Sequence, residues 1–363
     1  MNKAFAIVTA LALGTALALL ITGHWPDPTD PATPAFQISY DPGYGVSDIS
    51  VSPDDRYVLT VVNGELYGKA GPARLYDLRA RKEVHQLGNA WCGAWRPDGR
   101  VLALGLADGQ HIALLDTDTW KIRDTLAFTP PNVISQSILR LAFDQSGNLY
   151  AAIRNYTDME HNELAWGAKV WWQSGEHYSK EPQSIGKCQQ QSFDVTVASL
   201  RGDTLVAISY RRECPVEVLR IHSENGRRTI THENQLKAVG ASFIRFASDG
   251  QRLAIIDSNS AQLVARDANG FKRRILAEPW PYKYLLDPDK DPPIAPMHFL
   301  DVSADGRLIA GLVIANSKVA VIRADDGKAV LKSWNQGMPA LSHDGHLLVV
   351  AAVDHNLKFY AIP

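Results

Sequence analysis

The sequence lacks the short motifs that identify many catalytic sites. It has no Gly-x-Ser-x-Gly elbow for a nucleophilic serine, no Cys-x-x-Cys-His for haem attachment and no glycine-rich phosphate loop. The eleven histidines are dispersed, without the His-x-His or His-Glu-x-x-His clusters of metalloenzymes. The sequence therefore offers no motif for an enzyme, and we expect no cofactor.

An excess of charge of one sign is lacking as well. The 37 Lys and Arg residues are nearly matched by 39 Asp and Glu residues, which gives a net charge of −2. Proteins that bind nucleic acid usually carry a basic patch or stripe. The basic residues here are scattered, so we expect them to be solvated and we expect no nucleic acid among the partners.

Helical periodicity is lacking after residue 36. Instead, one phrase returns seven times, in which two apolar runs flank a tight polar turn. Asp-Gly and Asn-Gly pairs tolerate the positive φ angles that hairpin turns require. The turn residues follow one another at intervals of about 40 to 55 residues, and they are Asp55, Gly99, Gly147, Gly202, Gly250, Gly306 and Gly345.

A period of this length with four short strands per unit is typical of propeller blades. The last unit supplies only three strands, over 338–342, 347–353 and 357–362, and the strand over 36–40 would supply its fourth. This pairing would remove exposed sheet edges. We therefore predict an all-β fold, a seven-bladed β-propeller of four-stranded antiparallel blades over 36–363, closed by the N-terminal strand.

The body of the chain, from about residue 35 to the end, resembles a WD-repeat β-propeller of an exported bacterial type. The family's Trp-Asp pair at the end of the third strand is represented by Tyr76-Asp77 and Leu115-Asp116, and its Gly-His pair near the start of each unit is absent. The resemblance implies the architecture. It does not imply the structural network that the missing residues build in that family.

The N-terminal segment predicts export. Residues 4–22 are apolar or small, a length of about 28 Å as a helix, which can span a bilayer core. One lysine precedes this run and no basic residue follows until Arg56, so the propeller is expected outside. Residues 1–23 are either a cleaved signal peptide or an uncleaved anchor. The Pro-rich stretch 24–35 is expected to be an extended tether, and the protein to be periplasmic, touching the membrane through 4–22 only.

Two of the three cysteines are placed symmetrically about a turn. Cys188 and Cys214 each lie 13 residues from Arg201, so an antiparallel hairpin would set them opposite each other at its open end. An oxidising compartment permits a disulfide, and we predict a Cys188–Cys214 bridge. Cys92 lies in an apolar strand and is expected to be a buried free thiol.

Long loops are expected on one face of the propeller, which indicates the working surface. They are predicted over 63–71, 128–136, 154–167, 178–191 and 277–298, whereas the other face carries short turns. Aromatic residues with polar tips are frequent in recognition surfaces, although they also pack long loops onto themselves. The binding-face candidates are Tyr67, Tyr156, His161, Trp166, Trp280, Tyr282 and Tyr284.

Metal sites have only weak candidates. Asp287, Asp289 and Asp291 alternate as at the start of a calcium loop, but the glycine and the later glutamate of that loop are absent. A solvated acidic loop fits this run better. The group Asp158, Glu160, His161 and Glu163 is likewise better read as exposed, so no metal is predicted.

Two functional hypotheses remain. The first is a non-enzymatic exported scaffold that binds a protein, peptide or envelope component through the loop-rich face. The alternative is a periplasmic propeller enzyme, lactonase-like or oxidoreductase-like, acting on a small molecule at the central channel. Polar residues at the start of each unit's first strand, such as Asp48 and Asp301, are the candidates at the channel mouth.

Overall fold

A computed structural model describes most of the chain beyond the N-terminal segment. The described residues form strands and turns, and no helix occurs among them. They are 32–40, 45–64, 69–128, 133–157, 167–188, 192–210, 214–224, 227–236, 241, 243–256, 261–267, 270–275, 300–313, 318–325, 329–333, 335 and 337–363. Within this part of the chain, no helix is long and apolar enough to cross a membrane. The predicted export segment 4–22 lies outside it.

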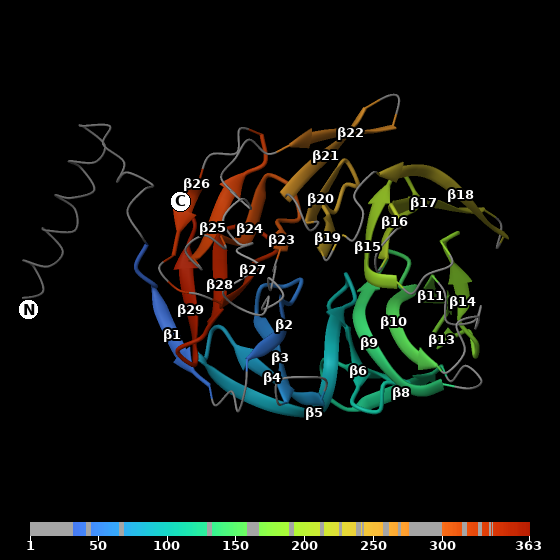
Figure 1. The fold of residues 1–363 in the computed structure, drawn as a ribbon. Coiled ribbons are helices and arrows are strands. Elements are labelled where there is room, and N and C mark those ends of the chain that lie inside the picture. Colours follow the sequence, from blue (N-terminus) through green and yellow to red (C-terminus); the bar gives the residue numbers. More distant parts are fainter. Residues whose placement is uncertain are drawn as a thin grey trace, which may run out of the picture.

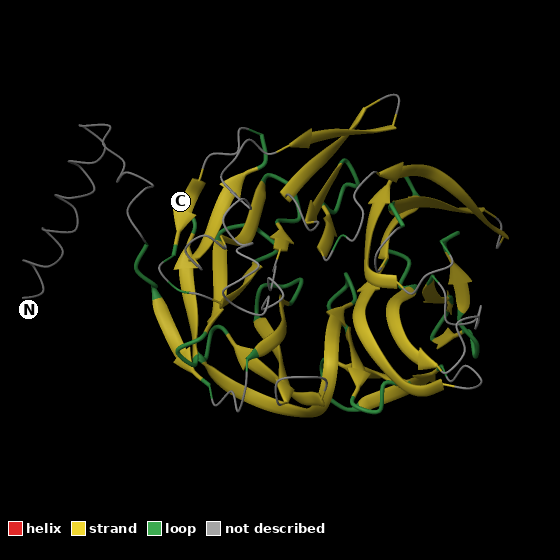
Figure 2. Cartoon of the chain, viewed as in Figure 1, coloured by secondary structure: helices red, strands yellow, loops and turns green. Residues whose placement is uncertain are grey.

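The strands form consecutive antiparallel units arranged around a centre (Figures 1 and 2). The first four units contain β2 (Val46–Val51), β3 (Tyr57–Gly64), β4 (Lys69–Asp77) and β5 (Lys82–Trp95); then β6 (Val101–Leu106), β7 (His111–Asp116) and β8 (Ile122–Ala127); then β9 (Val133–Phe143), β10 (Leu149–Thr157), β11 (Ala168–Trp171) and β14 (Gln183–Ile185); then β15 (Ser192–Leu200), β16 (Asp203–Tyr210), β17 (Val216–Glu224) and β18 (Arg227–Leu236).

Three further units follow in the same order. They contain β19 (Phe243–Phe246), β20 (Arg252–Ile256), β21 (Ala261–Asp267) and β22 (Gly270–Ile275); then β23 (Leu300–Val302), β24 (Leu308–Val313), β25 (Lys318–Arg323) and β26 (Ala329–Lys332); then β27 (Gly337–Leu341), β28 (Leu347–Ala352) and β29 (Asn356–Ala361). The last unit has β1 (Phe36–Ser39) as its fourth strand, with Phe36 paired to Phe359.

Units 1 and 2 share one long strand. β5 pairs with β4 through its first part and with β6 through its last part, so it is both the outer strand of unit 1 and the inner strand of unit 2. The two units therefore form one seven-stranded sheet, whereas the other units are separate four-stranded sheets.

Apolar side chains fill the spaces between neighbouring units. Seven buried clusters of described residues each combine two consecutive units, and one of them joins the last unit to the first through residues such as Val58 and Phe359. The inner strands also contact one another in sequence from β2 to β27, and β27 contacts β2. Strands that face such neighbours on both sides bury apolar residues on both faces, which explains the near-continuous apolar runs of β6 and β28.

The repeated turns have the backbone that the sequence predicts. All seven turn residues have positive φ, from 53° at Asp55 to 89° at Gly202. In unit 4, Arg201 has positive φ as well, and Leu200 pairs directly with Asp203. This two-residue loop has the positive φ at both central positions that a type I′ turn requires.

Several predicted loops are partly strand. β9 begins at Val133 and β10 continues to Thr157, and these two residues pair, so 128–136 and 154–167 are shorter loops than predicted. β3 and β4 similarly shorten the loop predicted over 63–71, because Gly64 at the end of β3 pairs with Lys69 at the start of β4. These segments are polar, and the backbone pairing that extends them does not need an apolar pattern.

The prediction for 178–191 was also wrong. This segment contains β14, the fourth strand of unit 3, which pairs with β11. β14 has only three residues and therefore shows no period in the sequence. The same unit carries an extra hairpin, β12 (Gln173–Ser174) with β13 (His177–Tyr178), between its third and fourth strands. The Tyr178 hydroxyl donates to the Gly147 carbonyl, 3.0 Å away, so this insertion lies on the face expected to carry short turns only.

Candidate functional site

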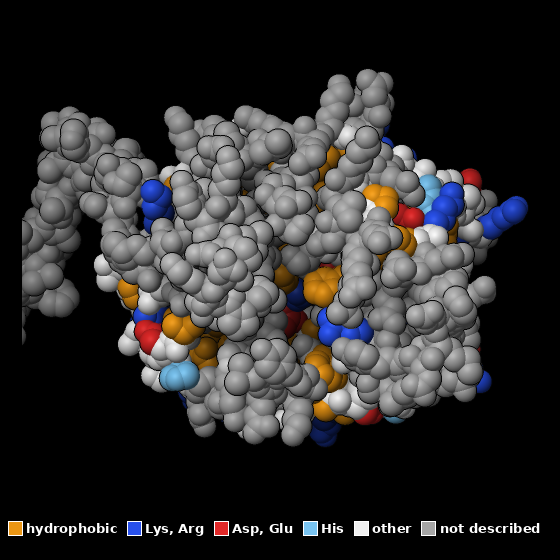
Figure 3. All heavy atoms as spheres, in the orientation of Figure 1, with side chains coloured by type: hydrophobic (Ala, Val, Ile, Leu, Met, Phe, Trp, Pro, Cys, Tyr) orange, Lys and Arg blue, Asp and Glu red, His pale blue; other side chains and the backbone are white. Residues whose placement is uncertain are grey.

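A cavity of about 340 Å³ lies at the centre of the propeller. Every unit contributes to its lining through the inner strand or the turn that follows it. Acidic, basic and apolar atoms are visible near the middle of the space-filling view (Figure 3). The ionisable lining residues are Asp48, Arg140, Asp144, Arg245, Asp301 and His343.

The position of the charged side chains follows from the period of a strand. Asp48 and Arg140 both lie four residues before the residue that opens the turn, Ser52 or Asp144. Arg245 and Asp301 lie two residues before theirs. Side chains two residues apart in a strand share one face, so these groups belong to the same side of their inner strands.

Asp48 joins three units. Its Oδ2 accepts a hydrogen bond from the Gly93 amide at 2.9 Å, and its Oδ1 accepts one from Arg140 Nη1 at 2.6 Å. Gly93 has no room for a side chain, because a Cβ there would lie 2.4 Å from Leu59 Cδ2. Glycine at this position therefore lets units 1 and 2 pack closely enough for the Gly93 amide to reach Asp48.

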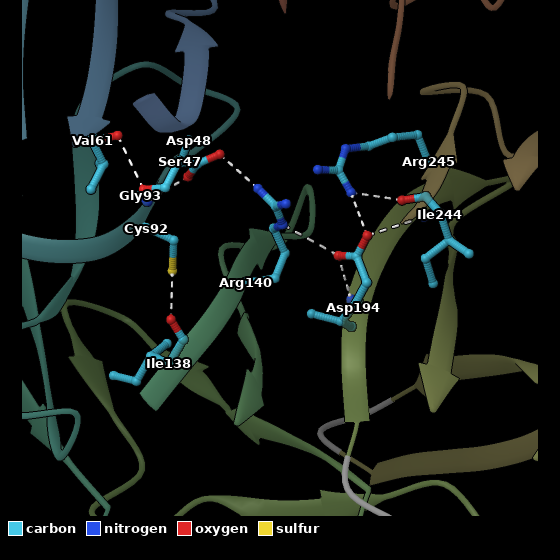
Figure 4. A network of polar contacts seen from close by, with 11 residues as sticks. Ser47, Asp48, Val61, Cys92, Gly93, Ile138, Arg140, Asp194, Ile244 and Arg245 are labelled. Atoms are coloured by element: carbon cyan, nitrogen blue, oxygen red, sulfur yellow. Dashed lines mark hydrogen bonds and ion pairs between the residues drawn. The ribbon is translucent and has the colours of Figure 1, made fainter. Parts of the chain in front are cut away.

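Asp194, on the inner strand of unit 4, is a buried carboxylate with several partners (Figure 4). It accepts hydrogen bonds from the amides of Val195 and Ile244, at 2.8 and 3.0 Å, and from Arg245 Nη1 at 3.0 Å. Arg140 Nε lies 3.4 Å from its Oδ1. Two guanidinium groups from neighbouring units therefore neutralise one buried carboxylate.

Arg140 bridges Asp48 and Asp194 from its place on β9 (Figure 4). Burial disfavours the charged form of Arg140, but the two carboxylates outweigh it and raise the pKa of this group above its ordinary value. The guanidinium therefore stays charged in a place where a lone charge would be costly.

Asp301 differs from the other two aspartates. It accepts hydrogen bonds from the amides of Leu341 and Val302, at 2.7 and 2.9 Å, but no side chain of the described residues forms an ion pair with it. Burial raises the pKa of this carboxyl above its ordinary value, against the opposing effect of the two amides and of Arg245. Asp301 remains partly exposed.

The three carboxylates have one arrangement in common. Each accepts an amide N–H from the inner strand of the next unit: Asp48 from unit 2, Asp194 from unit 5 and Asp301 from unit 7. Charge-assisted hydrogen bonds of this kind are stronger than neutral ones. They fix the spacing of neighbouring units at the centre.

The cysteines are placed as the sequence predicts. Cys188 and Cys214 form a disulfide with a Cα–Cα separation of 6.3 Å at the open end of the β15–β16 hairpin. Cys92 is a buried free thiol whose Sγ donates to the Ile138 carbonyl at 3.3 Å. Burial raises the pKa of the Cys92 thiol, which makes it unreactive as a nucleophile.

Most predicted binding-face residues lie outside the described residues. Tyr156 is on β10, where its backbone pairs with Ser135, and its side chain is not described. The candidates outside the description are Tyr67, His161, Trp166, Trp280, Tyr282, Tyr284 and the acidic residues Asp287, Asp289 and Asp291. Among described residues, no three His, Cys, Asp or Glu side chains are grouped so that they could hold a metal ion.

Sequence reasoning found part of the central site. It proposed Asp48 and Asp301 for the channel, and both line the cavity. It missed Arg140, Asp194 and Arg245. A search for charged residues two or four positions before each turn would have found both arginines, but Asp194 lies further from its shorter turn.

No protein-family model matches the chain, and no curated protein matches it. Solved structures do. The β-propeller domain of Cps50 (Swd1) from Myceliophteria thermophila has a TM-score of 0.58 and 12% identity, over 91% of this chain and 100% of that one. A chain of hydrazine synthase from Kuenenia stuttgartiensis has 0.57 and 14%, over 91% and 99%. A chain of the Mitotic Checkpoint Complex has 0.58 and 13%, over 93% and 95%.

These likenesses show the fold. The chain is an all-β protein with the architecture of a β-propeller, and two of the three similar structures carry titles that name a propeller domain or a multiprotein complex. At 12–14% identity the comparisons carry no residue of a site from those proteins to this one.

Proposed function

We propose that this chain is a non-enzymatic, exported binding scaffold. It is a seven-bladed propeller closed by β1, and it binds a protein, peptide or envelope component through the face that carries the long loops. Residues 1–23 export it to the periplasm, either as a cleaved signal peptide or as an anchor through 4–22, with 24–35 as the tether. The pairing of β1 with β29 and the unbroken series of contacts from β2 to β27 and back to β2 support the closed ring.

The observation that carries this proposal is the use of the central carboxylates. Asp48 and Asp194, which could act as acids or bases in an enzyme, are bonded to arginines and to amides of the next unit. A carboxylate held in this way acts as a structural link, because proton transfer would break its ion pair. The centre therefore favours a rigid frame that presents loops.

The similar structures support binding as the role of this fold. One is a propeller domain of Cps50 (Swd1), and another is a chain within the Mitotic Checkpoint Complex. Propeller loops are carried on a rigid scaffold, and loops of this kind commonly provide recognition surfaces. The loop 277–298, rich in aromatic residues, connects units 5 and 6 and is our first choice for the contact.

The test is a cross-linking pull-down from solubilised envelopes with the intact chain and a variant. The variant replaces 280–293 by a Gly-Ser segment of equal length. We expect the partner bound by the intact chain to be lost from the variant. The matched control changes the opposite face, by Glu176→Ala in the β12–β13 hairpin, and it should retain the partner. Equal recovery by the intact chain and the 280–293 variant would refute the loop-face proposal.

A further inference from the structure

The cavity holds hydrogen-bond donors that have no acceptor among the described residues. Arg245 uses Nη1 for Asp194 and the Ile244 carbonyl, and Arg140 uses Nη1 and Nε for the two aspartates. Among the described residues, Nε and Nη2 of Arg245 and Nη2 of Arg140 have no hydrogen-bond partner. Both side chains line the cavity, and they are 21% and 13% exposed. A guanidinium with two free N–H groups can hold a carboxylate.

The cavity also holds a carboxylate, that of Asp301, which forms no ion pair with a described residue. Asp301 lies on the inner strand of the unit next to that of Arg245, and each is two residues before its turn, so the two occupy equivalent positions. β19 and β23, which carry them, are in contact. Asp301 is the only one of the three inner-strand aspartates that forms no ion pair with a described residue. A cationic group in the cavity would supply the ion-pair partner that Asp301 lacks among the described residues.

The two features lie side by side and are opposite in charge. The inner strands contribute three carboxylates, Asp48, Asp194 and Asp301, against the two guanidinium groups, so a purely anionic ligand would add to an excess of negative charge. Asp144 also lines the cavity, but its carboxylate is bonded to Asn148 and Tyr150. A ligand that carries both a carboxylate and an ammonium group matches the guanidinium donors and the Asp301 carboxylate together.

We propose that the central cavity binds a free α-amino acid, with its carboxylate on Arg245 and Arg140 and its ammonium group on Asp301. A volume of about 340 Å³ is at the small end of the range for ligand sites, which suits a ligand of this size. Apolar lining residues that remain partly exposed, such as Trp95, Val197 and Val302, provide contacts for an apolar side chain. This site is separate from the loop-rich face, so it adds a small ligand to the proposed scaffold.

The first test uses the intact full-length protein and isothermal titration calorimetry. The twenty L-α-amino acids are titrated one at a time, with L-leucine as the reference for apolar side chains. For each one that binds, its two halves are titrated next; for leucine these are 4-methylpentanoate, which lacks the ammonium group, and 3-methylbutylamine, which lacks the carboxylate. We expect each half to bind at least tenfold more weakly than the amino acid, because each loses one charged hydrogen-bonded contact.

The second test separates the contribution of Asp301 from that of the two arginines. Asp301→Asn should weaken the amino acid at least tenfold while the affinity for the deaminated acid stays the same. A general distortion of the cavity would weaken both. Asp305→Asn, at the exposed turn of the same unit, is the matched control and should bind as the unchanged protein does. The half-ligands and Asp301→Asn decide the question without a variant of Arg245, whose loss would also remove its bond to Asp194.

Three results would overturn the proposal. These are no binding by any of the twenty amino acids, a half-ligand that binds as tightly as its parent, and an Asp301→Asn variant that loses the amino acid and the deaminated acid equally. None of these results bears on the pull-down that tests the loop-rich face, so the two proposals can fail independently.

Discussion

The turns and the inner strands of this propeller follow different rules. The turns repeat: Ser52, Ser303 and Ser342 each donate to an aspartate two residues on and accept an amide from five residues on. The inner strands do not repeat. Four residues before the turn they carry Asp48 in unit 1, Cys92 in unit 2 and Arg140 in unit 3.

This difference separates the scaffold from the site. A bond that recurs in several units is required by the geometry of their hairpin turns, which is the same in each. A side chain that appears in one unit only is required by its particular neighbours at the centre. Arg140, for example, contacts both Asp48 and Asp194, which come from two other units. The comparison predicts that changes to unrepeated residues cost more than changes to repeated ones.

The largest effect is expected for Arg140→Met. This substitution leaves Asp48 and Asp194 without their shared cation inside the cavity. Removing one partner of a buried ion pair typically costs about 3–5 kcal/mol. We therefore expect the free energy of unfolding, measured by denaturant titration, to fall by about this amount.

The matched control for Arg140→Met is a repeated-turn arginine. Arg56 pairs with Asp77 at 3.3 Å, but its side chain is 45% exposed. Ion pairs at such positions contribute at most about 1 kcal/mol, so Arg56→Met should cost much less. If the two substitutions proved equally costly, the distinction between turns and inner strands would be wrong.

The second effect concerns unit 4, which departs from the repeat both at its two-residue turn and at its disulfide. Replacing Cys188 and Cys214 together by serine removes a link between residues 26 positions apart. Opening a loop of this length costs about 3 kcal/mol through the added freedom of the unfolded chain. Thermal unfolding should show a lower midpoint for the double variant.

A reductant provides the control for the disulfide. It should lower the unfolding midpoint of the intact protein to that of the double serine variant, and it should leave the variant unchanged. Cys92 is buried and has no partner cysteine, so it cannot replace the link. A double variant as stable as the intact oxidised protein would show that unit 4 does not depend on its disulfide.

The third effect is small and should be the same in three places. Ser52→Ala, Ser303→Ala and Ser342→Ala each remove a hydroxyl that accepts a turn amide at 2.8–3.0 Å. A hydrogen bond of this kind contributes about 1 kcal/mol, so the three free energies of unfolding should fall by about 1 kcal/mol each. Ser223→Ala, at an exposed strand position, is the control and should change little. Losses of unfolding free energy that differ widely among the three turns would argue that these turns are not equivalent.

The sequence predicts the repeated parts well and the unrepeated parts poorly. The seven turns and the Cys188–Cys214 bridge follow from local rules, positive φ and hairpin symmetry, that one sequence contains. The partners of Arg140 do not, because 92 residues separate it from Asp48 and 54 from Asp194, and only the packing of units brings them together. β14 was missed for a related reason, since a three-residue strand is defined by its neighbour β11 and not by its own pattern.

The smallest effect is a pH dependence at the unrepeated turn of unit 4. Asp203 follows this turn, and its carboxylate bonds His222 Nδ1 at 2.6 Å. The hydrogen bond to Asp203 and its charge raise the pKa of His222 above 6.5. Because the charged imidazole is the form that is favoured on folding, the contact stabilises the fold fully below pH 6.5, and this stabilisation is lost as the pH rises through the raised pKa.

An NMR titration should place the His222 midpoint above 6.5 in the intact protein. In Asp203→Asn it should return toward 6.5, whereas Glu224→Gln, which removes the more distant carboxylate 3.7 Å from Nε2, should shift it less. A His222 midpoint unchanged by Asp203→Asn would mean that the departure of this turn from the repeat has no electrostatic consequence.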